Sequence, residues 1–231
     1  MSLLISPRSP AAEAFRTLRT SLHYVVDRDS CKVILITSVN PEDGKTIITT
    51  NLAVSLAQAG EKVLVVDGDI RKPRCHRVFA LSNRVGLTNM LVDAVDLQAA
   101  AQQSSIAGLS VLTSGPIPPN PAELLESKAM SDVLQLARSQ YDHVLVDSPP
   151  AGALADATIL ASKVDGIILV ITAGETRVDD ARDVKESLER AKGKVLGAVL
   201  NRVRYSTKDY RYRYYYEDRG GAESSSDDIA K

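Results

Sequence analysis

The sequence has little cysteine, no excess of either charge and no long hydrophobic run. Its two cysteines, Cys31 and Cys75, are too few for a disulfide framework, which favours a cytosolic protein. The 28 Lys and Arg residues are balanced by 29 Asp and Glu residues, so no overall basic field would draw the chain to nucleic acid or anionic lipid. No apolar run approaches the ~18 residues of a membrane span, and Met1 to Pro10 lack the apolar region of a signal peptide.

Short apolar runs alternate with helical patterns along most of the 231 residues. This alternation predicts an α/β fold with a mainly parallel central sheet and helices on both faces. Ligands bind to such sheets beyond the carboxyl ends of the strands. The predicted strands are 32–37, 62–67, 109–113, 143–147, 166–172 and 195–201, and the predicted helices between them are 46–59, 86–104, 121–140, 153–162 and 176–192.

Two segments lie outside this alternation. Ser9 and Pro10 are typical of the start of a helix, which we expect to run to about Val26. Residues 205–231 contain almost no aliphatic side chains, so they bury too little surface to offset the entropy of ordering them. We therefore expect one domain over 1–204 and a flexible tail over 205–231.

The strongest motif is a phosphate-binding loop between the first predicted strand and its helix. Gly44 allows close approach of the backbone to phosphate, Lys45 would neutralise phosphate charge, and the Thr46 hydroxyl would bind Mg²⁺. Val39 stands where the usual pattern has its first glycine. An ordinary turn followed by a surface lysine is the weaker interpretation. The predicted nucleotide-binding residues are Pro41, Glu42, Asp43, Gly44, Lys45, Thr46 and Ile47.

Carboxylates follow two of the predicted strands. Asp67 and Asp69 end one strand, and Asp147 ends another. Each alone is more typical of a helix cap or a turn. Together they would meet at one edge of the sheet, where like charges repel unless a cation is present. The sequence therefore predicts a Mg²⁺ site built from Thr46, Asp69 and Asp147.

The base of the nucleotide is predicted to be adenine. The Asn-Lys-x-Asp motif that reads guanine is replaced by Asn-Arg-Val-Arg at 201–204, and the Asp-x-x-Gly motif of small GTPases is replaced at 147–150. ATP is therefore the expected nucleotide. Asn201 is a candidate adenine contact, although a polar cap at the strand end explains it equally well.

These motifs, in this order, resemble the bacterial tyrosine kinases (BY-kinases) of capsule and exopolysaccharide synthesis, the CpsD/CapB-like family. The resemblance covers essentially the whole chain. It departs at Glu42, where the family often has glycine; a positive φ there would strain the loop. The matching motifs are Pro41 to Thr46, Asp67-Gly-Asp-Ile-Arg71, Val144-Leu-Val-Asp-Ser-Pro-Pro150, Glu13-Ala-Phe-Arg-Thr-Leu-Arg19 and a cluster of tyrosines after residue 204.

The resemblance implies a P-loop NTPase fold and an ATP–Mg²⁺-dependent tyrosine autokinase that regulates polysaccharide synthesis and export. It implies that Asp67 accepts the proton of the incoming tyrosine hydroxyl, and that Lys45 and Arg71 stabilise the transferred phosphoryl group. The implied phosphoacceptors are Tyr205, Tyr210, Tyr212, Tyr214, Tyr215 and Tyr216.

The resemblance also implies partners. Glu13, Arg16 and Arg19 would join subunits into a ring, typically an octamer, although a solvated face is the commoner role of such a triplet. A transmembrane polysaccharide co-polymerase adaptor would activate the kinase at the inner face of the membrane, and a cognate tyrosine phosphatase would reverse its action. No nucleic-acid partner is expected, and stacking of the tail tyrosines on single strands is the weaker interpretation.

Two alternatives remain open at this point. One is a partition-type or cell-division-type P-loop ATPase, which usually carries a second lysine where Asn40 stands. The other is a nucleotide-dependent assembly regulator that phosphorylates nothing. Phosphotyrosine formation on ATP–Mg²⁺ separates the three hypotheses.

Overall fold

The computed structural model describes residues 9–25 and 33–203. The chain divides into two units, Met1–Asn201 and Arg202–Lys231, and the fold described here is that of the first. The predicted tail, 205–231, lies outside the described residues.

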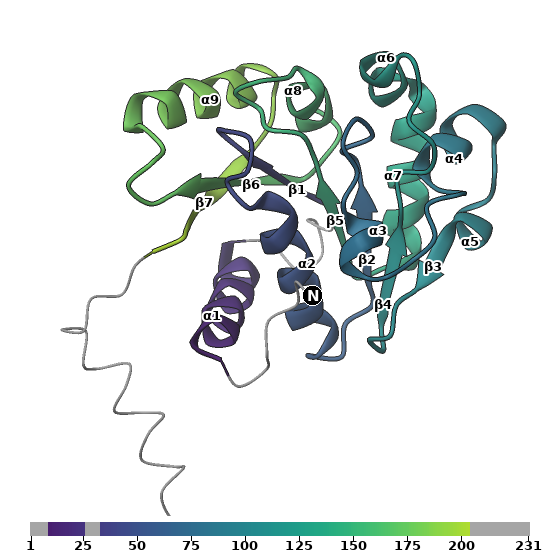
Figure 1. Ribbon diagram of the computed structural model, residues 1–231, viewed down its shortest axis with the longest axis horizontal. Helices are drawn as coiled ribbons and strands as arrows, with labels where there is room; N and C mark the ends of the chain where they lie inside the picture. Colours follow the sequence, from purple (N-terminus) through teal and green to yellow (C-terminus); the bar gives the residue numbers. More distant parts are fainter. Residues whose placement is uncertain (1–8, 26–32, 204–231) are drawn as a thin grey trace, which may run out of the picture. The chain divides into compact units, whose positions relative to one another are not determined.

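A seven-stranded sheet forms the centre of the first unit (Figure 1). Its order is β3-β4-β2-β5-β1-β6-β7, and all described neighbours pair in parallel except β3 and β4. This order places β1 between β5 and β6, where both of its edges are covered. The strands are β1 (Val33–Ser38), β2 (Val63–Asp67), β3 (Ala101–Gln103), β4 (Leu109–Leu112), β5 (His143–Asp147), β6 (Gly166–Thr172) and β7 (Val195–Asn201).

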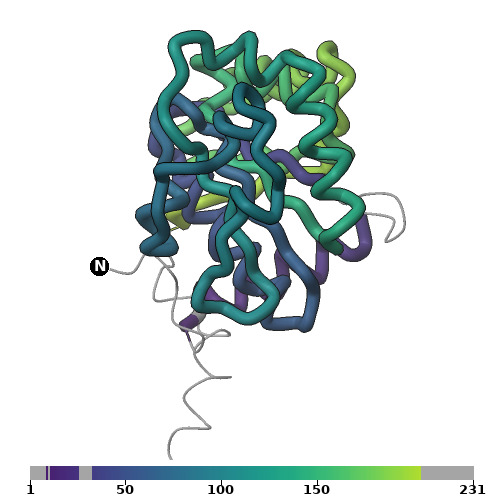
Figure 2. Tube along the Cα trace, turned by 90° about the vertical axis from the view of Figure 1, so that its right-hand side faces the viewer, coloured from purple at the N-terminus to yellow at the C-terminus, as the bar shows by residue number. Residues whose placement is uncertain are grey.

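Helices cover both faces of the sheet, as the sequence predicts. Successive residues of β1 point to opposite faces: Ile34 and Ile36 pack with one group of helices, and Val33 and Leu35 with the other. Figures 1 and 2 show the helical layers from two directions. The first group is α1 (Pro10–Val25), α2 (Lys45–Ala57) and α3 (Cys75–Val78); the second is α4 (Leu87–Asp93), α5 (Leu97–Ala100), α6 (Pro121–Glu126), α7 (Lys128–Gln140), α8 (Asp156–Ala161) and α9 (Val178–Arg190).

The first helix begins where the sequence predicts. The Ser9 hydroxyl accepts a hydrogen bond from the main-chain N–H of Ala12 at 3.2 Å, and Pro10 is the first helical residue. Phe15 and Leu22 of α1 are buried in the same hydrophobic cluster as residues of α2 and of one face of the sheet. No helix among the described residues is long and apolar enough to cross a bilayer.

The predicted helix over 86–104 is wrong. The segment contains α4 and α5, and β3 then pairs antiparallel with β4, with Ala101 opposite Leu112. Ala94 adopts a left-handed conformation between the two helices, with φ of 53°. The open edge of β4 gives Ala101–Gln103 hydrogen-bonding partners, and this tertiary pairing overrides the local helical preference.

The predicted helix over 121–140 is divided at Ser127. Its ψ of 159° is not helical, so the chain stops turning there. The Ser127 hydroxyl then accepts a hydrogen bond from the N–H of Met130 at 3.2 Å and begins α7. The short helix α3 was not predicted.

Candidate active site

The phosphate loop connects the central strand β1 to α2. Gly44 precedes α2 with a φ of 93°, and an added Cβ would lie 2.2 Å from Nδ2 of Asn201. Both the conformation and the close approach require glycine at this position. Glu42 has a φ of 67°, which is the left-handed strain expected for a non-glycine residue there.

The Asp43 carboxylate braces the loop from within. One of its oxygens accepts the main-chain N–H of Asn40 at 2.7 Å, and the other accepts the Thr172 hydroxyl at 2.7 Å. Nδ2 of Asn201 donates to the main-chain oxygen of Asp43 at 2.7 Å. The ends of β6 and β7 therefore hold the loop in shape. Asn201 thus has a structural role, and its contact with adenine stays a prediction.

The three predicted carboxylates meet beside the loop because their strands are neighbours. Asp67 at the end of β2 is paired in register with Asp147 at the end of β5. Asp67 and Asp147 are fully buried, and Asp69 is 8% exposed. The Thr46 hydroxyl donates to Asp147 at 2.6 Å, and the Thr49 hydroxyl does so at 3.2 Å. The acidic cluster is therefore joined directly to the first turn of α2.

Among the residues that the structure describes, few positive groups oppose this buried charge. Nζ of Lys45 lies 3.9 Å from a carboxylate oxygen of Asp69. One oxygen of Asp67 accepts the main-chain N–H groups of Arg74 and Cys75, at 3.1 and 2.9 Å. Its other oxygen, Oδ1, is buried and has no hydrogen-bond partner among the described residues.

Arg71 is paired with a carboxylate in this structure. Its guanidinium donates two hydrogen bonds to the buried carboxylate of Asp156, at 2.7 and 3.0 Å. Each of these two hydrogen bonds goes to a different oxygen of Asp156, so Arg71 is anchored to the start of α8 in this structure. A role at the transferred phosphoryl group requires Arg71 to leave Asp156 or to act from its present place, and stays a prediction.

Burial and mutual repulsion disfavour ionisation in the acidic cluster. Burial, reinforced by the charge of Asp147, raises the pKa of Asp67 to about 8. Burial raises the pKa of Asp147 to about 6, against the opposing attraction of Lys45 and the hydrogen bond from Thr46. Burial also raises the pKa of the Cys75 thiol, which lies 3.8 Å from Oδ2 of Asp147.

The chemistry of these donors fits a hard divalent cation. Asp67, Asp69, Asp147 and Thr46 offer oxygen ligands, the type that Mg²⁺ prefers. The charge of this cluster, which among the described residues forms an ion pair with Lys45 alone, is what a bound cation would satisfy. A cluster of Asp67, Cys75 and Asp147 has ligand atoms within 4.8 Å of one another, so the thiol lines the same position.

Comparison with known proteins decides between the hypotheses. A profile of the family described as AAA domain matches residues 31–194. Tyrosine-protein kinase YwqD of Bacillus subtilis (strain 168) is 46% identical over 213 residues, which cover 92% of this chain and 89% of that protein. The kinase domain of the Escherichia coli tyrosine kinase ETK superposes with a TM-score of 0.85 at 35% identity, covering 88% of this chain and 80% of that one.

The chain belongs to the bacterial tyrosine kinases. Its enzyme class is therefore protein-tyrosine kinase, as the five motifs predict. The septum site-determining protein MinD from Pyrococcus horikoshii OT3, solved in complex with Mg-ADP, is also similar, with a TM-score of 0.66 and 26% identity over 77% of this chain and 73% of that one. The likeness to MinD confirms the P-loop NTPase fold.

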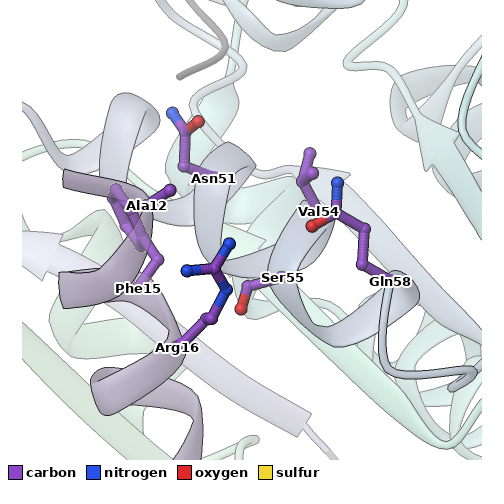
Figure 3. A pocket seen from close by; sticks show the side chains of 7 residues that line it. All are labelled: Ala12, Phe15, Arg16, Asn51, Val54, Ser55 and Gln58. Carbon is purple, nitrogen blue, oxygen red and sulfur yellow. The ribbon is translucent and has the colours of Figure 1, made fainter. Parts of the chain in front are cut away.

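The amino-terminal helix of this bacterial tyrosine kinase lies along α2. Nη1 of Arg19 donates to the main-chain oxygen of Ser55 at 2.6 Å. Arg16 pairs with Glu13 within α1, and both side chains are partly exposed. Figure 3 shows Phe15 and Arg16 of α1 and Asn51 and Ser55 of α2 among the residues that line a pocket between the two helices. Of the predicted oligomerisation triplet, Arg19 donates within the chain, and Glu13 and Arg16 are partly exposed; the part that all three play in subunit contact stays a prediction.

Several residues of the kinase site were not predicted from the sequence. Thr49 follows Thr46 by one helical turn, a spacing that could have indicated a second hydroxyl at Asp147. Cys75, Asp156 and Thr172 carry no local signal, because each reaches the site from a separate part of the chain.

Proposed function

We propose that this chain is an ATP-dependent autokinase that phosphorylates tyrosines in the carboxyl-terminal segment of neighbouring subunits, and so regulates capsule or exopolysaccharide synthesis and export. One observation carries the proposal: three buried or nearly buried carboxylates meet a lysine-bearing phosphate loop at the ends of three adjacent strands. A phosphoryl group held there would face both a cation site and an acidic side chain able to accept a proton.

In this proposal each residue has a separate task. The loop N–H groups from Pro41 to Thr46 bind the β- and γ-phosphates of ATP, and Lys45 neutralises their charge. Thr46, Asp69 and Asp147 hold Mg²⁺ directly or through water. Mg²⁺, when bound, supplies charge neutralisation between the phosphates and the carboxylates.

Asp67 is the proposed proton acceptor. Its Oδ2 is fixed by the two N–H groups of Arg74 and Cys75, while Oδ1 is left to receive the proton of the tyrosine hydroxyl. The phenol oxygen attacks the γ-phosphorus, the bond to the β–γ bridging oxygen breaks, and ADP leaves. Lys45, and Arg71 if released from Asp156, would stabilise charge on the transferred group.

The proposed acceptors are the six tyrosines of 205–216, which lie outside the described residues. Residues 204–231 contain six basic and six acidic side chains, so the unmodified segment is nearly neutral. Six phosphates would add roughly −9 to −12 charge at about −1.5 to −2 each. Modification would therefore convert a neutral segment into a strongly anionic one, which a site lined by carboxylates would expel.

Delivery of these tyrosines needs a neighbouring subunit. We infer a closed ring, an octamer in the family pattern, with contacts through Glu13, Arg16 and Arg19. A transmembrane polysaccharide co-polymerase adaptor would activate the ring at the cytoplasmic face of the membrane, and a cognate tyrosine phosphatase would reset it. The partly exposed Glu13–Arg16 pair beside the pocket of α1 and α2 supports this surface.

Phosphosite mapping after incubation of the full chain with ATP–Mg²⁺ tests the proposal. We expect phosphotyrosine within 205–216 and, by light scattering, an oligomer that dissociates on phosphorylation and reforms after phosphatase treatment. Hydrolysis of ATP without phosphotyrosine would support a partition-type ATPase, and nucleotide binding with neither reaction would support an assembly regulator. A monomer in both phosphorylation states would contradict the ring.

A further inference from the structure

A second cluster of ionisable side chains lies at the opposite, amino-terminal end of the strands. His23 is in the last turn of α1, Glu61 lies between α2 and β2, and His143 is the first residue of β5. Val63 of β2 is paired in register with His143, which brings the nearby Glu61 to it, and the packing of α1 on α2 brings His23. Three separate segments therefore converge on one point, and none of the three residues belongs to the proposed nucleotide site.

The Glu61 carboxylate lies between the two imidazoles. Its Oε1 is 3.1 Å from Nε2 of His23, and its Oε2 is 2.6 Å from Nε2 of His143. The rings are nearly perpendicular, with an interplanar angle of 81° and centroids 6.0 Å apart. One ligand atom from each of the three residues lies within 4.8 Å of the others. A tetrahedral Zn²⁺ with bonds of about 2.0–2.1 Å places its ligand atoms about 3.3 Å apart, so small side-chain rotations complete the geometry.

The contacts within this cluster leave buried polar atoms unsatisfied, among them Oε2 of Glu61 and Nδ1 of His143. Oε2 of Glu61 is buried and accepts no hydrogen bond from any described residue, although Nε2 of His143 faces it at 2.6 Å. A carboxylate oxygen and an imidazole nitrogen that face each other without an aligned proton are the pair that a cation satisfies.

The donor set and its exposure indicate the class of ion. Two imidazole nitrogens and one carboxylate suit Zn²⁺ and related first-row ions, whereas Mg²⁺ prefers oxygen alone. The side chains of His23, Glu61 and His143 are 23%, 21% and 13% exposed. Solvent can therefore reach the cluster, which gives the ion a path of entry and leaves a fourth position for water.

We propose that His23, Glu61 and His143 form a Zn²⁺-class metal site that ties the end of α1 to the amino-terminal ends of β2 and β5. The site is distinct from the acidic cluster at the other end of the sheet. Because α1 also carries Glu13 and Arg16, a bound ion would fix the helix whose exposed face is the proposed subunit contact.

Titration of the tag-free, metal-stripped full chain with Co²⁺ tests this site, with saturating Mg²⁺–ADP present to occupy the nucleotide site. We expect one equivalent with the visible absorption of a four-coordinate ion, displaced by Zn²⁺, and without the near-ultraviolet band of a thiolate ligand. His23→Gln and His143→Gln should each weaken binding by about 100-fold or more, because loss of a ligand costs more than loss of a group that only orients one. His76→Gln alters the chain's third histidine, which lies outside the cluster, and should leave binding unchanged.

Thermal unfolding provides the second measurement. Zn²⁺ should raise the midpoint of the wild type and of His76→Gln, and should not raise that of His23→Gln. If His143→Gln fails to fold, His23→Gln alone tests the site, because the partly exposed position of His23 tolerates glutamine. The proposal is overturned if Co²⁺ binding persists in His23→Gln, if His76→Gln loses it equally, if the thiolate band shows that a cysteine is the ligand, or if no ion binds.

Discussion

The two ends of the central sheet carry ionisable clusters of opposite character. At the carboxyl end, Asp67 and Asp147 are fully buried and Asp69 is nearly so. Nζ of Lys45 lies 3.9 Å from a carboxylate oxygen of Asp69. At the amino end, Glu61 lies between two imidazoles and remains partly exposed. The first cluster concentrates like charge among oxygen donors, and the second mixes nitrogen with oxygen. The two ends therefore differ in donor chemistry and in uncompensated charge, the properties by which protein sites select between Mg²⁺ and Zn²⁺.

The largest expected effect comes from removing the only positive group paired with the acidic cluster among the described residues. Lys45→Met should reduce phosphotransfer by on the order of 10³-fold or more, because charge on the phosphates is no longer neutralised. The fold should remain intact, although loss of the nearly buried ion pair with Asp69 should lower the thermal midpoint. Phosphotyrosine formation with ATP–Mg²⁺ measures the activity, and Lys185→Met, on α9 and paired with Glu189 on the surface, is the matched control. Robust autophosphorylation by Lys45→Met would refute the assignment of the loop.

The charge difference between the two ends should appear in the pH dependence of stability. The pKa of Asp67 is about 8 in the folded chain against 3.8 for the free side chain, so between these values the folded state holds a proton that the unfolded state has released. Stability from this group is therefore full below pH 4 and is lost as pH rises towards 8.

Asp67→Asn should remove that loss. We expect the metal-free variant to melt above the wild type at pH 8 and to match it near pH 4. Added Mg²⁺ should raise the wild-type midpoint at pH 8 more than that of the variant. The variant should also lose about 10²- to 10⁴-fold of its phosphotransfer activity. The exposed Asp132→Asn is the control, and an unchanged pH slope in Asp67→Asn would show that the cluster does not hold uncompensated charge.

The close packing of Asn201 against the phosphate loop can be tested at Gly44. Gly44→Ala should weaken ADP binding by about 10-fold and destabilise the fold by about 1–3 kcal/mol, because φ is 93° and the new methyl meets Nδ2 of Asn201. Adding Asn201→Ala should relieve the contact and leave the backbone strain, so the double variant recovers stability only in part. Calorimetric binding of ADP and thermal unfolding measure both effects. Full recovery in the double variant would show that the close contact alone demands glycine.

The sequence predicted the part of the site that depends on strand order. Each carboxylate follows an apolar run, and parallel strands end at one edge, so the convergence of Asp67 and Asp147 needed only the fold class. The α/β class and the kinase family are confirmed. The side-chain contacts that hold the loop and Arg71 in place could not be predicted in this way. The residues of the Thr172–Asp43 hydrogen bond are 129 positions apart in the sequence, and those of the Arg71–Asp156 pair are 85 apart. Such contacts depend on tertiary packing, which leaves no periodic signal in the chain.

The segment 86–104 shows the same limit in the fold. Its alanines favour a helix locally, but Ala101–Gln103 instead complete the open edge of β4. The amino-terminal cluster was missed for a related reason, because His23, Glu61 and His143 are far apart in sequence and their spacing matches no metal motif. The tyrosine segment, 205–231, lies outside the described residues, so its role stays a prediction.

The smallest expected effect separates backbone strain from charge at Glu42. Its φ of 67° costs roughly 1–2 kcal/mol for a non-glycine residue, whereas glycine costs about 0.5–1 kcal/mol in chain entropy. Glu42→Gly should therefore change stability by no more than about 1 kcal/mol, while ADP binds a few-fold more tightly because a negative charge beside the phosphates is gone. Glu42→Gln removes the charge and keeps the strain, so it should give most of the gain in affinity. Lys192→Gly relieves the same conformation, with φ of 66°, far from the loop motif, and should alter stability without altering ADP affinity. If Glu42→Gln leaves ADP affinity unchanged and Glu42→Gly raises it, then backbone conformation, and not charge, sets the affinity of this loop.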